Sequence, residues 1–263
     1  MPREYATRRR TRTEVASRVC PPSDDRTAVF TRLRSRPDNV HLGLMLALTF
    51  STGIIDAVGY LGLDRVFTGN MTGNVVILGM ALAGADDLPV VGPVIALAGF
   101  MLGAAIGGRV LRPIKAGWTT RSTWLFTVVG LVMSVLAIVL GVVPEHPEPL
   151  ALTVTGVLGL AMGLQAATAR HIAVKDVTTV VVTSTITGLA ADSRLGGGKG
   201  QPWFRRLTAV ILIGAGAGVG ALALTVGLWL GLAIAAALTL IASLFGHLVA
   251  HTRHAQSEEA SAA

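Results

Sequence analysis

The chain has 263 residues, of which 52% are hydrophobic and only 14% are charged. A soluble domain carries about a quarter charged residues, so this composition excludes a soluble globular protein and predicts an integral membrane protein. The net charge of +7 comes from tails and loops between apolar runs. That placement is typical of positive-inside topology rather than of a nucleic-acid-binding protein.

The N-terminal segment, residues 1–38, is rich in Arg, Thr, Ser and Pro and contains no apolar run. We expect a disordered basic tail on the cytoplasmic side of the membrane. Residues 39–250 then form the transmembrane domain, and residues 251–263 form a cytoplasmic C-terminal tail. The single cysteine, Cys20, lies in the N-terminal tail, so an intramolecular disulfide is excluded.

Apolar runs fill the transmembrane domain, and six of them are about as long as a membrane-spanning helix. Two further runs, near 66–83 and 177–190, are shorter and are interrupted by Thr, Gly, Asn or Ser. The full-length runs are Leu42–Leu61, Val90–Leu111, Trp124–Val143, Leu150–Thr168, Leu207–Val226 and Leu228–Val249.

The distribution of basic residues decides whether the short segments cross the membrane. If neither crosses, 21 of the 22 Lys and Arg residues lie on the cytoplasmic side, whereas 15 of 22 lie there if both cross. The positive-inside rule favours the first arrangement. We therefore predict an all-α membrane protein with six full spans, two re-entrant or broken segments and both termini in the cytoplasm.

The first short segment contains the stretch Phe67-Thr68-Gly69-Asn70-Met71-Thr72-Gly73-Asn74, which repeats Thr-Gly-Asn at a spacing of four. If the stretch is helical, its two glycines share one face and allow another backbone to approach closely. If it is not helical, its glycines and asparagines favour a turn that caps a following helix. In either case, polar backbone within a membrane must be buried in protein or line an aqueous cavity.

An internal repeat relates the two halves, residues 41–143 and 150–250. The segment Gly53–Ala57 resembles Gly163–Ala167, and Phe67–Gly73 resembles Val182–Gly188. Each half contains three full spans, an odd number, so the halves run in opposite directions and form a 3+3 inverted-topology repeat. Interrupted segments at matching positions of two such halves indicate a transport site near the midplane of the membrane.

Asp56 is the only carboxylate well inside a predicted span. Because an acid there costs roughly 2.5–3.5 kcal/mol on insertion scales, it needs a partner or a cavity. Proton or cation coupling and a purely structural hydrogen bond, for example to Asn70 or Asn74, are both open interpretations. The residues predicted to line a substrate or ion pathway are Asp56, Tyr60, Thr68, Asn70, Thr72, Asn74, Gln165, Thr183 and Thr187. Those predicted to pack helices are Gly69, Gly73, Gly99, Gly103, Gly107, Gly214 and Gly218.

Enzymatic motifs are missing from the sequence: it contains no nucleophile elbow, phosphate-binding loop or paired acids. His247 and His251 have the i, i+4 spacing of metal ligands, but no carboxylate or cysteine completes a set. We therefore expect no enzyme activity, no metal and no cofactor.

A family resemblance agrees with these predictions. The pattern Gly53-x-x-Asp56-Ala57-x-x-Tyr60, followed by the Met71–Asn74 signature, resembles the YoaK-like family of bacterial polytopic membrane proteins, a family of unknown function. The resemblance covers residues 40–250 and implies a multi-pass protein of the bacterial inner membrane, often described as a permease. It supplies no substrate. Ala166 and Leu189 stand where Asp56 and Asn74 stand in the first half, so the halves have diverged.

Three functions are compatible with this sequence. The leading hypothesis is a transporter or permease for an unknown small molecule or ion, with its site between the two short segments. A passive channel and a non-transporting membrane scaffold are the alternatives. The expected partner is the lipid bilayer rather than nucleic acid, and whether copies of the chain form a homo-oligomer is left open.

Overall fold

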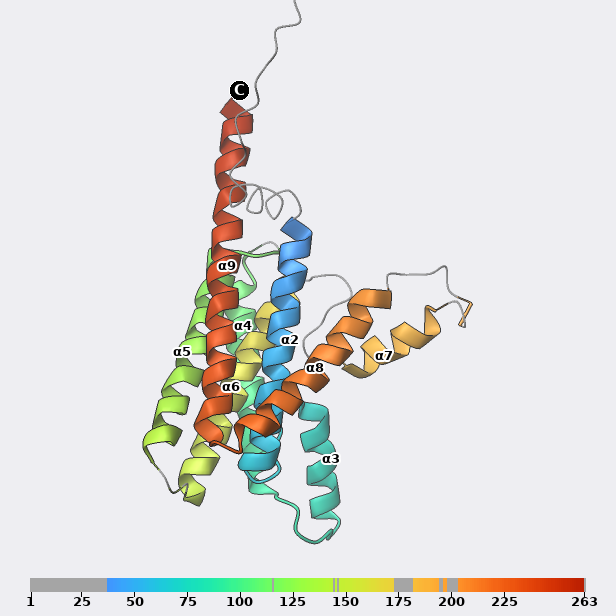
Figure 1. Cartoon of the computed structure of the whole chain (residues 1–263), viewed down its shortest axis with the longest axis vertical. Coiled ribbons are helices and arrows are strands. Elements are labelled where there is room, and N and C mark those ends of the chain that lie inside the picture. Colours follow the sequence, from blue (N-terminus) through green and yellow to red (C-terminus); the bar gives the residue numbers. More distant parts are fainter. Residues whose placement is uncertain are drawn as a thin grey trace, which may run out of the picture. The chain divides into compact units, whose positions relative to one another are not determined.

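A computed structural model of the chain describes residues 37–114, 116–143, 145, 147–172, 182–193, 196–197 and 203–262. In these residues the only regular secondary structure is helical (Figure 1). The helices are α2 (Pro37–Gly62), α3 (Met71–Leu82), α4 (Val91–Leu111), α5 (Thr120–Val142), α6 (Glu148–Ile172), α7 (Val182–Ala191), α8 (Trp203–Ala223) and α9 (Leu228–Ala262). The predicted all-α class is confirmed.

Six of these helices, α2, α4, α5, α6, α8 and α9, are long and apolar enough to cross a membrane. The backbone of a helix satisfies its own hydrogen bonds, which is what a chain without access to water requires. The two interrupted segments contain the short apolar helices α3 and α7. In Figure 1, α2 ends and α4 begins at the same end of the bundle, with α3 between them in the chain.

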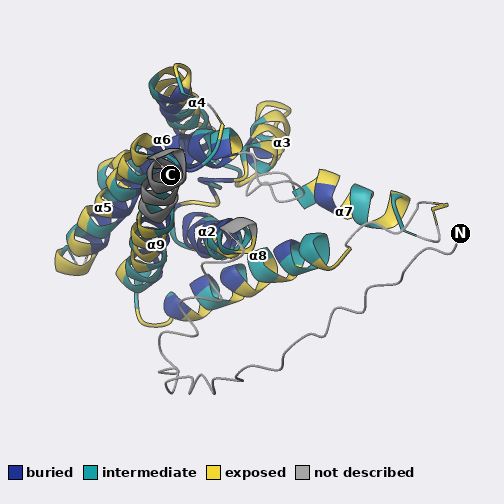
Figure 2. Ribbon diagram, turned by 90° about the horizontal axis from the view of Figure 1, so that it is seen from above, coloured by how far each residue is buried: buried dark blue, intermediate teal, exposed yellow. Residues whose placement is uncertain are grey.

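The core lies among the long helices. Its central side chains come from four of them: Ile54 on α2, Met133 on α5, Leu158 on α6 and Leu232 on α9 are all fully buried. Figure 2 shows the buried faces turned toward this centre, while α3 and α7 lie at the edge of the bundle. Since α3 packs on α4 and α7 packs on α8, each short helix has one principal neighbour.

Glycines bring the backbones of α4 and α6 into direct contact. A Cβ atom added at Gly103 of α4 would collide with the carbonyl oxygen of Leu160 and lie 3.0 Å from the nitrogen of Leu164. From the other side, a Cβ at Gly163 of α6 would collide with the carbonyl oxygen of Phe100. Both helices therefore need glycine at this crossing.

The pair α2 and α8 makes the corresponding contacts. A Cβ at Gly216 of α8 would collide with the carbonyl oxygen of Phe50 and lie 3.3 Å from the nitrogen of Ile54. A Cβ at Gly53 of α2 would collide with the carbonyl oxygen of Ile213. Three further sets of contacts also occur in corresponding pairs: α5–α6 with α2–α9, α3–α4 with α7–α8, and α4–α5 with α8–α9. Two other helix pairs in contact are α5–α9 and α2–α6.

The glycines predicted to pack helices have different surroundings in α4 and in α8. Gly99, Gly103 and Gly107 of α4 all face α6. A Cβ at Gly214 or Gly218 of α8, in contrast, would meet nothing within 4 Å, so the described structure places no other helix of the chain against these two glycines. The glycines of α8 that contact α2 are Gly216 and Gly220. Glycine occupies every second position from 214 to 220, so two faces of α8 carry glycines. The predicted pair lies on the face turned away from α2.

The predicted terminal segments lie largely outside the described residues. Of the N-terminal tail, only Pro37 and Asp38 are described, as the first residues of α2. The predicted short segment 177–190 is described from Val182 onward. At the other end, α9 continues to Ala262, through the segment assigned to the C-terminal tail, because its Ala, Gln and Glu residues favour a helix.

Candidate functional site

The stretch that the sequence singled out is a turn followed by a helix, the second of the two predicted alternatives. Residues 63–70 are not helical, and α3 begins at Met71. Asn70 caps it, since its side-chain Oδ1 accepts a hydrogen bond from the backbone N–H of Gly73 at 3.3 Å. This is the usual role of asparagine at an N-cap.

The carboxylate of Asp56 lies against the backbone of this turn. Its Oδ1 accepts hydrogen bonds from the backbone N–H groups of Gly69 at 2.7 Å and Asn70 at 3.2 Å. Both donors directly precede α3, so the carboxylate also lies at the positive end of that helix dipole. No ion pair to Asp56 is found in the described part of the chain, and main-chain donors compensate the acid instead.

Gly69 is the point where three elements meet. A Cβ atom added there would lie 3.0 Å from Cγ2 of Thr52, 3.2 Å from Oδ1 of Asp56 and 3.2 Å from Cε of Met162. Thr52 and Asp56 belong to α2, and Met162 belongs to α6. The turn therefore approaches both helices at a position where any side chain larger than hydrogen would be crowded.

Polar groups of α2, α6 and the turn are buried around this point. Gln165 of α6 donates from Nε2 to Oγ1 of Thr52 at 3.4 Å, and Thr52 donates in turn to the carbonyl oxygen of Leu48 at 2.9 Å. Gln165 Oε1 and Thr68 Oγ1 are fully buried and have no hydrogen-bond partner among the described residues. Buried polar atoms are nearly always paired, so two unpaired oxygens on residues that adjoin the Asp56 contact indicate a place for a ligand or water.

Asn74 has a different role from the one predicted. Its side-chain Oδ1 accepts from the backbone N–H of Phe67 at 2.9 Å, and its Nδ2 donates to the carbonyl oxygen of Phe67 at 2.6 Å. The amide thus satisfies the main chain of the turn, and no hydrogen bond joins it to Asp56 in the described structure. We conclude that Asn74, which is buried, holds the shape of the turn rather than lining a pathway.

Four other predicted pathway residues have side chains that make no hydrogen bond with the Asp56 carboxylate in the described structure. Tyr60 is 37% exposed and stacks on Phe67, with ring centroids 4.8 Å apart. Thr72 lies on the exposed face of α3. Thr183 and Thr187 lie on the exposed face of α7, where the Thr187 hydroxyl donates to the carbonyl oxygen of Thr183 at 2.9 Å.

Two glycines predicted to pack helices, Gly69 and Gly73, lie instead in the turn and at the start of α3. Gly69 lies before the first residue of α3, so it is not part of a helix face. Gly73 lies in the first turn of α3, and a Cβ there would approach the ring of Phe67 at 2.6 Å. The prediction assumed a helix through both glycines, whereas the Asn70 cap starts the helix between them.

Thr52 and Met162 were missed by the sequence analysis. Thr52 could have been found, because it precedes Asp56 by four residues and so shares its helix face. Met162 could not have been found in this way, since a methionine in an apolar run is expected simply to be part of the hydrophobic core.

Comparisons with known proteins place the chain in a family. The family model described as "Protein of unknown function (DUF1275)" matches residues 44–245. The chain belongs to this family. Among curated proteins, it is similar to the UPF0700 transmembrane protein YoaK of Bacillus subtilis (strain 168), with 31% identity over 153 residues.

That match covers 57% of this chain and 65% of YoaK, slightly less than two thirds of the relative. The resemblance stated from the sequence is confirmed. No solved structure matches the chain. The DUF1275 match includes the whole of the Asp56 site, from Thr52 to Gln165, but its description supplies no activity.

Proposed function

We propose that this protein is a small-molecule transporter of the bacterial plasma (inner) membrane, with its site at the cluster around Asp56. The observation that carries the proposal is a pair of buried oxygens without partners in the described structure, Gln165 Oε1 and Thr68 Oγ1. Both belong to residues next to the Asp56 contact: Thr68 precedes Gly69, which donates to the carboxylate, and Gln165 donates to Thr52, one helical turn before Asp56. A membrane protein gains no stability from orphan polar groups, so a functional requirement is the best reason for keeping them.

The paired helix contacts support an inverted repeat. In the first half, Gly103 of α4 faces α6, and its counterpart in the second half, Gly216 of α8, faces α2. In the same way, Gly53 of α2 faces α8, and its counterpart Gly163 of α6 faces α4. With six crossings, α2 and α6 run in opposite directions, and so do the two halves. We propose that α3 and α7 are re-entrant helices at matching positions, the arrangement from which many secondary transporters build a midplane site. The basic residues of the loops favour cytoplasmic termini.

Asp56 is the proposed coupling group. Its carboxylate is held by the N–H groups of the turn before α3, so a displacement of α3 relative to α2 would separate donors and acceptor. Protonation of Asp56 would weaken the same contact, because a neutral acid is a poorer acceptor. Proton binding and movement of α3 are thereby linked. The unpaired groups include a pure acceptor, Gln165 Oε1, so the site suits a ligand that donates hydrogen bonds or carries positive charge.

The test is Asp56→Asn in proteoliposomes, using compounds first selected by thermal stabilisation of the wild-type protein. We expect the variant to fold, to keep exchange of substrate across the membrane, and to lose accumulation driven by a pH gradient. Asp86→Asn, which changes an exposed acid in the loop before α4, is the matched control and should behave as wild type. Full gradient-driven accumulation by Asp56→Asn would exclude Asp56 as the coupling group.

The alternative functions give different results in the same assay. A passive channel would carry flux that neither responds to substrate on the opposite side nor depends on Asp56. A membrane scaffold would show no flux, and Asp56→Asn would then affect only folding.

A further inference from the structure

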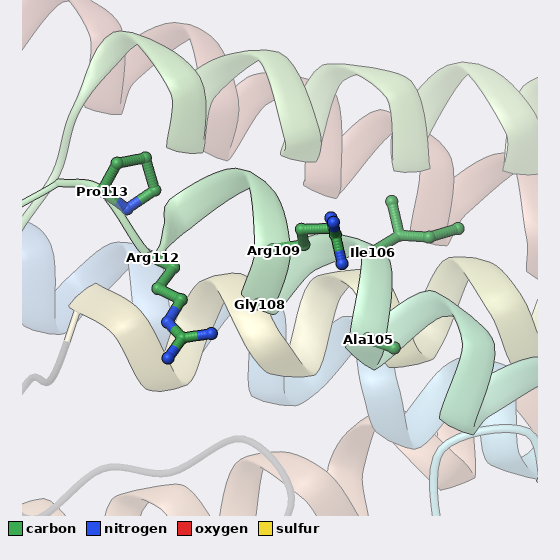
Figure 3. Close-up of a pocket in the computed structure, with 6 residues that line it drawn as sticks. All are labelled: Ala105, Ile106, Gly108, Arg109, Arg112 and Pro113. Carbon is green, nitrogen blue, oxygen red and sulfur yellow. The ribbon is translucent and has the colours of Figure 1, made fainter.

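The C-terminal end of α4 carries a hollow that is separate from the Asp56 cluster. It has a volume of about 660 Å³, within the range of roughly 300–1,000 Å³ that is common for ligand pockets. Figure 3 shows the side chains of Arg109 and Arg112 extending from the C-terminal end of α4, where Gly108 also lies. A Cβ added at Gly108 would meet nothing within 4 Å, so the space beside this glycine is open. The lining residues are Ala105, Ile106, Gly108, Arg109, Arg112 and Pro113.

Among the described residues, the ionisable side chains that line the hollow are both positive. They are Arg109 and Arg112, and neither makes an ion pair or hydrogen bond with another described residue. Arg121, which follows in the chain, is already engaged, since it donates to the carbonyl oxygen of Val110 at 3.0 Å. Arg109 and Arg112, two exposed guanidinium groups at the C-terminal end of α4, therefore fit an anion such as a phosphate.

An apolar surface continues from the hollow along α4 toward the middle of the membrane. Met101, Leu102 and Ile106 are exposed by 63%, 55% and 42%, on the face of α4 turned away from α6. In a membrane this face meets acyl chains. The whole surface thus offers positive charge at the end of the span and hydrocarbon contact below it.

We propose that this surface binds one anionic phospholipid, with its headgroup phosphate between Arg109 and Arg112 and an acyl chain along Leu102 and Ile106. Basic pockets at the ends of membrane spans are known to hold anionic headgroups. A competing explanation is that the arginines only complement the helix dipole or extend toward the membrane surface. That explanation requires the two positive charges but not the open space beside Gly108. A variant that fills the space and keeps the charges therefore distinguishes it from lipid binding.

The experiment measures thermal unfolding of the purified full-length chain in detergent, titrated with short-chain phosphatidylglycerol, phosphatidylcholine of the same chain length, or inorganic phosphate. We expect phosphatidylglycerol alone to raise the melting temperature of the wild type. Replacing both arginines, as Arg109→Gln with Arg112→Gln, should weaken its apparent affinity by roughly tenfold or more, since each basic residue near the surface contributes about 1 kcal/mol.

Gly108→Leu is the decisive variant, because it fills the hollow and keeps both charges. It should also lose the response to phosphatidylglycerol, while its melting temperature without lipid stays close to that of the wild type. Gly218→Leu, at a glycine of α8 with equally open surroundings, is the matched control and should respond normally. Arg205→Gln controls for loss of one positive charge elsewhere.

Three results would overturn the proposal: an unchanged response of Gly108→Leu, equal stabilisation by phosphatidylcholine, or full stabilisation by inorganic phosphate alone. The last would indicate a site for a free anion. If the double arginine variant does not fold, Gly108→Leu and Arg112→Gln alone decide the question.

Discussion

Two alanine substitutions on α8, only two residues apart, should change stability in opposite directions. At Gly216, the new Cβ would collide with the carbonyl oxygen of Phe50 and lie 3.3 Å from the nitrogen of Ile54. Both are backbone atoms, which cannot move aside by changing a rotamer. At Gly214, the new Cβ would meet nothing within 4 Å.

The magnitude follows from two opposing terms. Replacing glycine by alanine inside a helix favours the helix by up to about 1 kcal/mol. Overpacking at a close contact costs about 1–3 kcal/mol. Gly214→Ala therefore gains up to about 1 kcal/mol, because only the first term acts. Gly216→Ala loses a net amount of about 0–3 kcal/mol of stability, since α8 must move away from α2.

Thermal unfolding of the purified variants in detergent measures this difference. At roughly 2–4 °C per kcal/mol, Gly216→Ala should melt several degrees below Gly214→Ala. Gly103→Ala on α4 should match Gly216→Ala, because it meets the equivalent atoms of α6. If both α8 variants shift in the same direction by the same amount, the assignment of the contact face is wrong.

Two further predictions concern the site and the topology. Gln165→Leu should abolish transport while leaving the melting temperature unchanged or raising it. The reason is that it removes a buried oxygen that has no partner in the described structure. A marked loss of stability would instead show that Gln165 is structural. In a variant lacking Cys20, cysteines introduced at Lys115 and Lys199 should resist an impermeant thiol reagent in intact cells, since the positive-inside rule predicts that both loops are cytoplasmic. Ready labelling at position 115 would support eight crossings.

Helix number and type could be predicted from the sequence because they depend on run length and composition. Six runs near twenty residues and two interrupted ones correspond to six long and two short apolar helices. Asp56 could be singled out for a similar reason, as an acid within an apolar run is costly wherever the helix packs.

The details of the site depended on information that the sequence does not contain. Asn74 can serve a ligand or its own main chain equally well, and only the fold of the turn shows that it pairs with Phe67. The contact face of α8 was ambiguous because glycines occupy both candidate faces. Thr183 and Thr187 matched the first-half motif in sequence, yet they lie on the exposed face of α7.

The partners of Asp56 are main-chain groups, which has a consequence for how such a site changes during evolution. Every residue except proline supplies a backbone N–H, so substitutions at position 70 leave its donor to the carboxylate in place. Position 69 is restricted by space rather than by chemistry. The most damaging natural changes here should therefore be insertions or deletions between Leu63 and Asn70, which shift the donors along the chain. In related proteins, the length of this segment should be a better guide to a working site than the identity of its side chains.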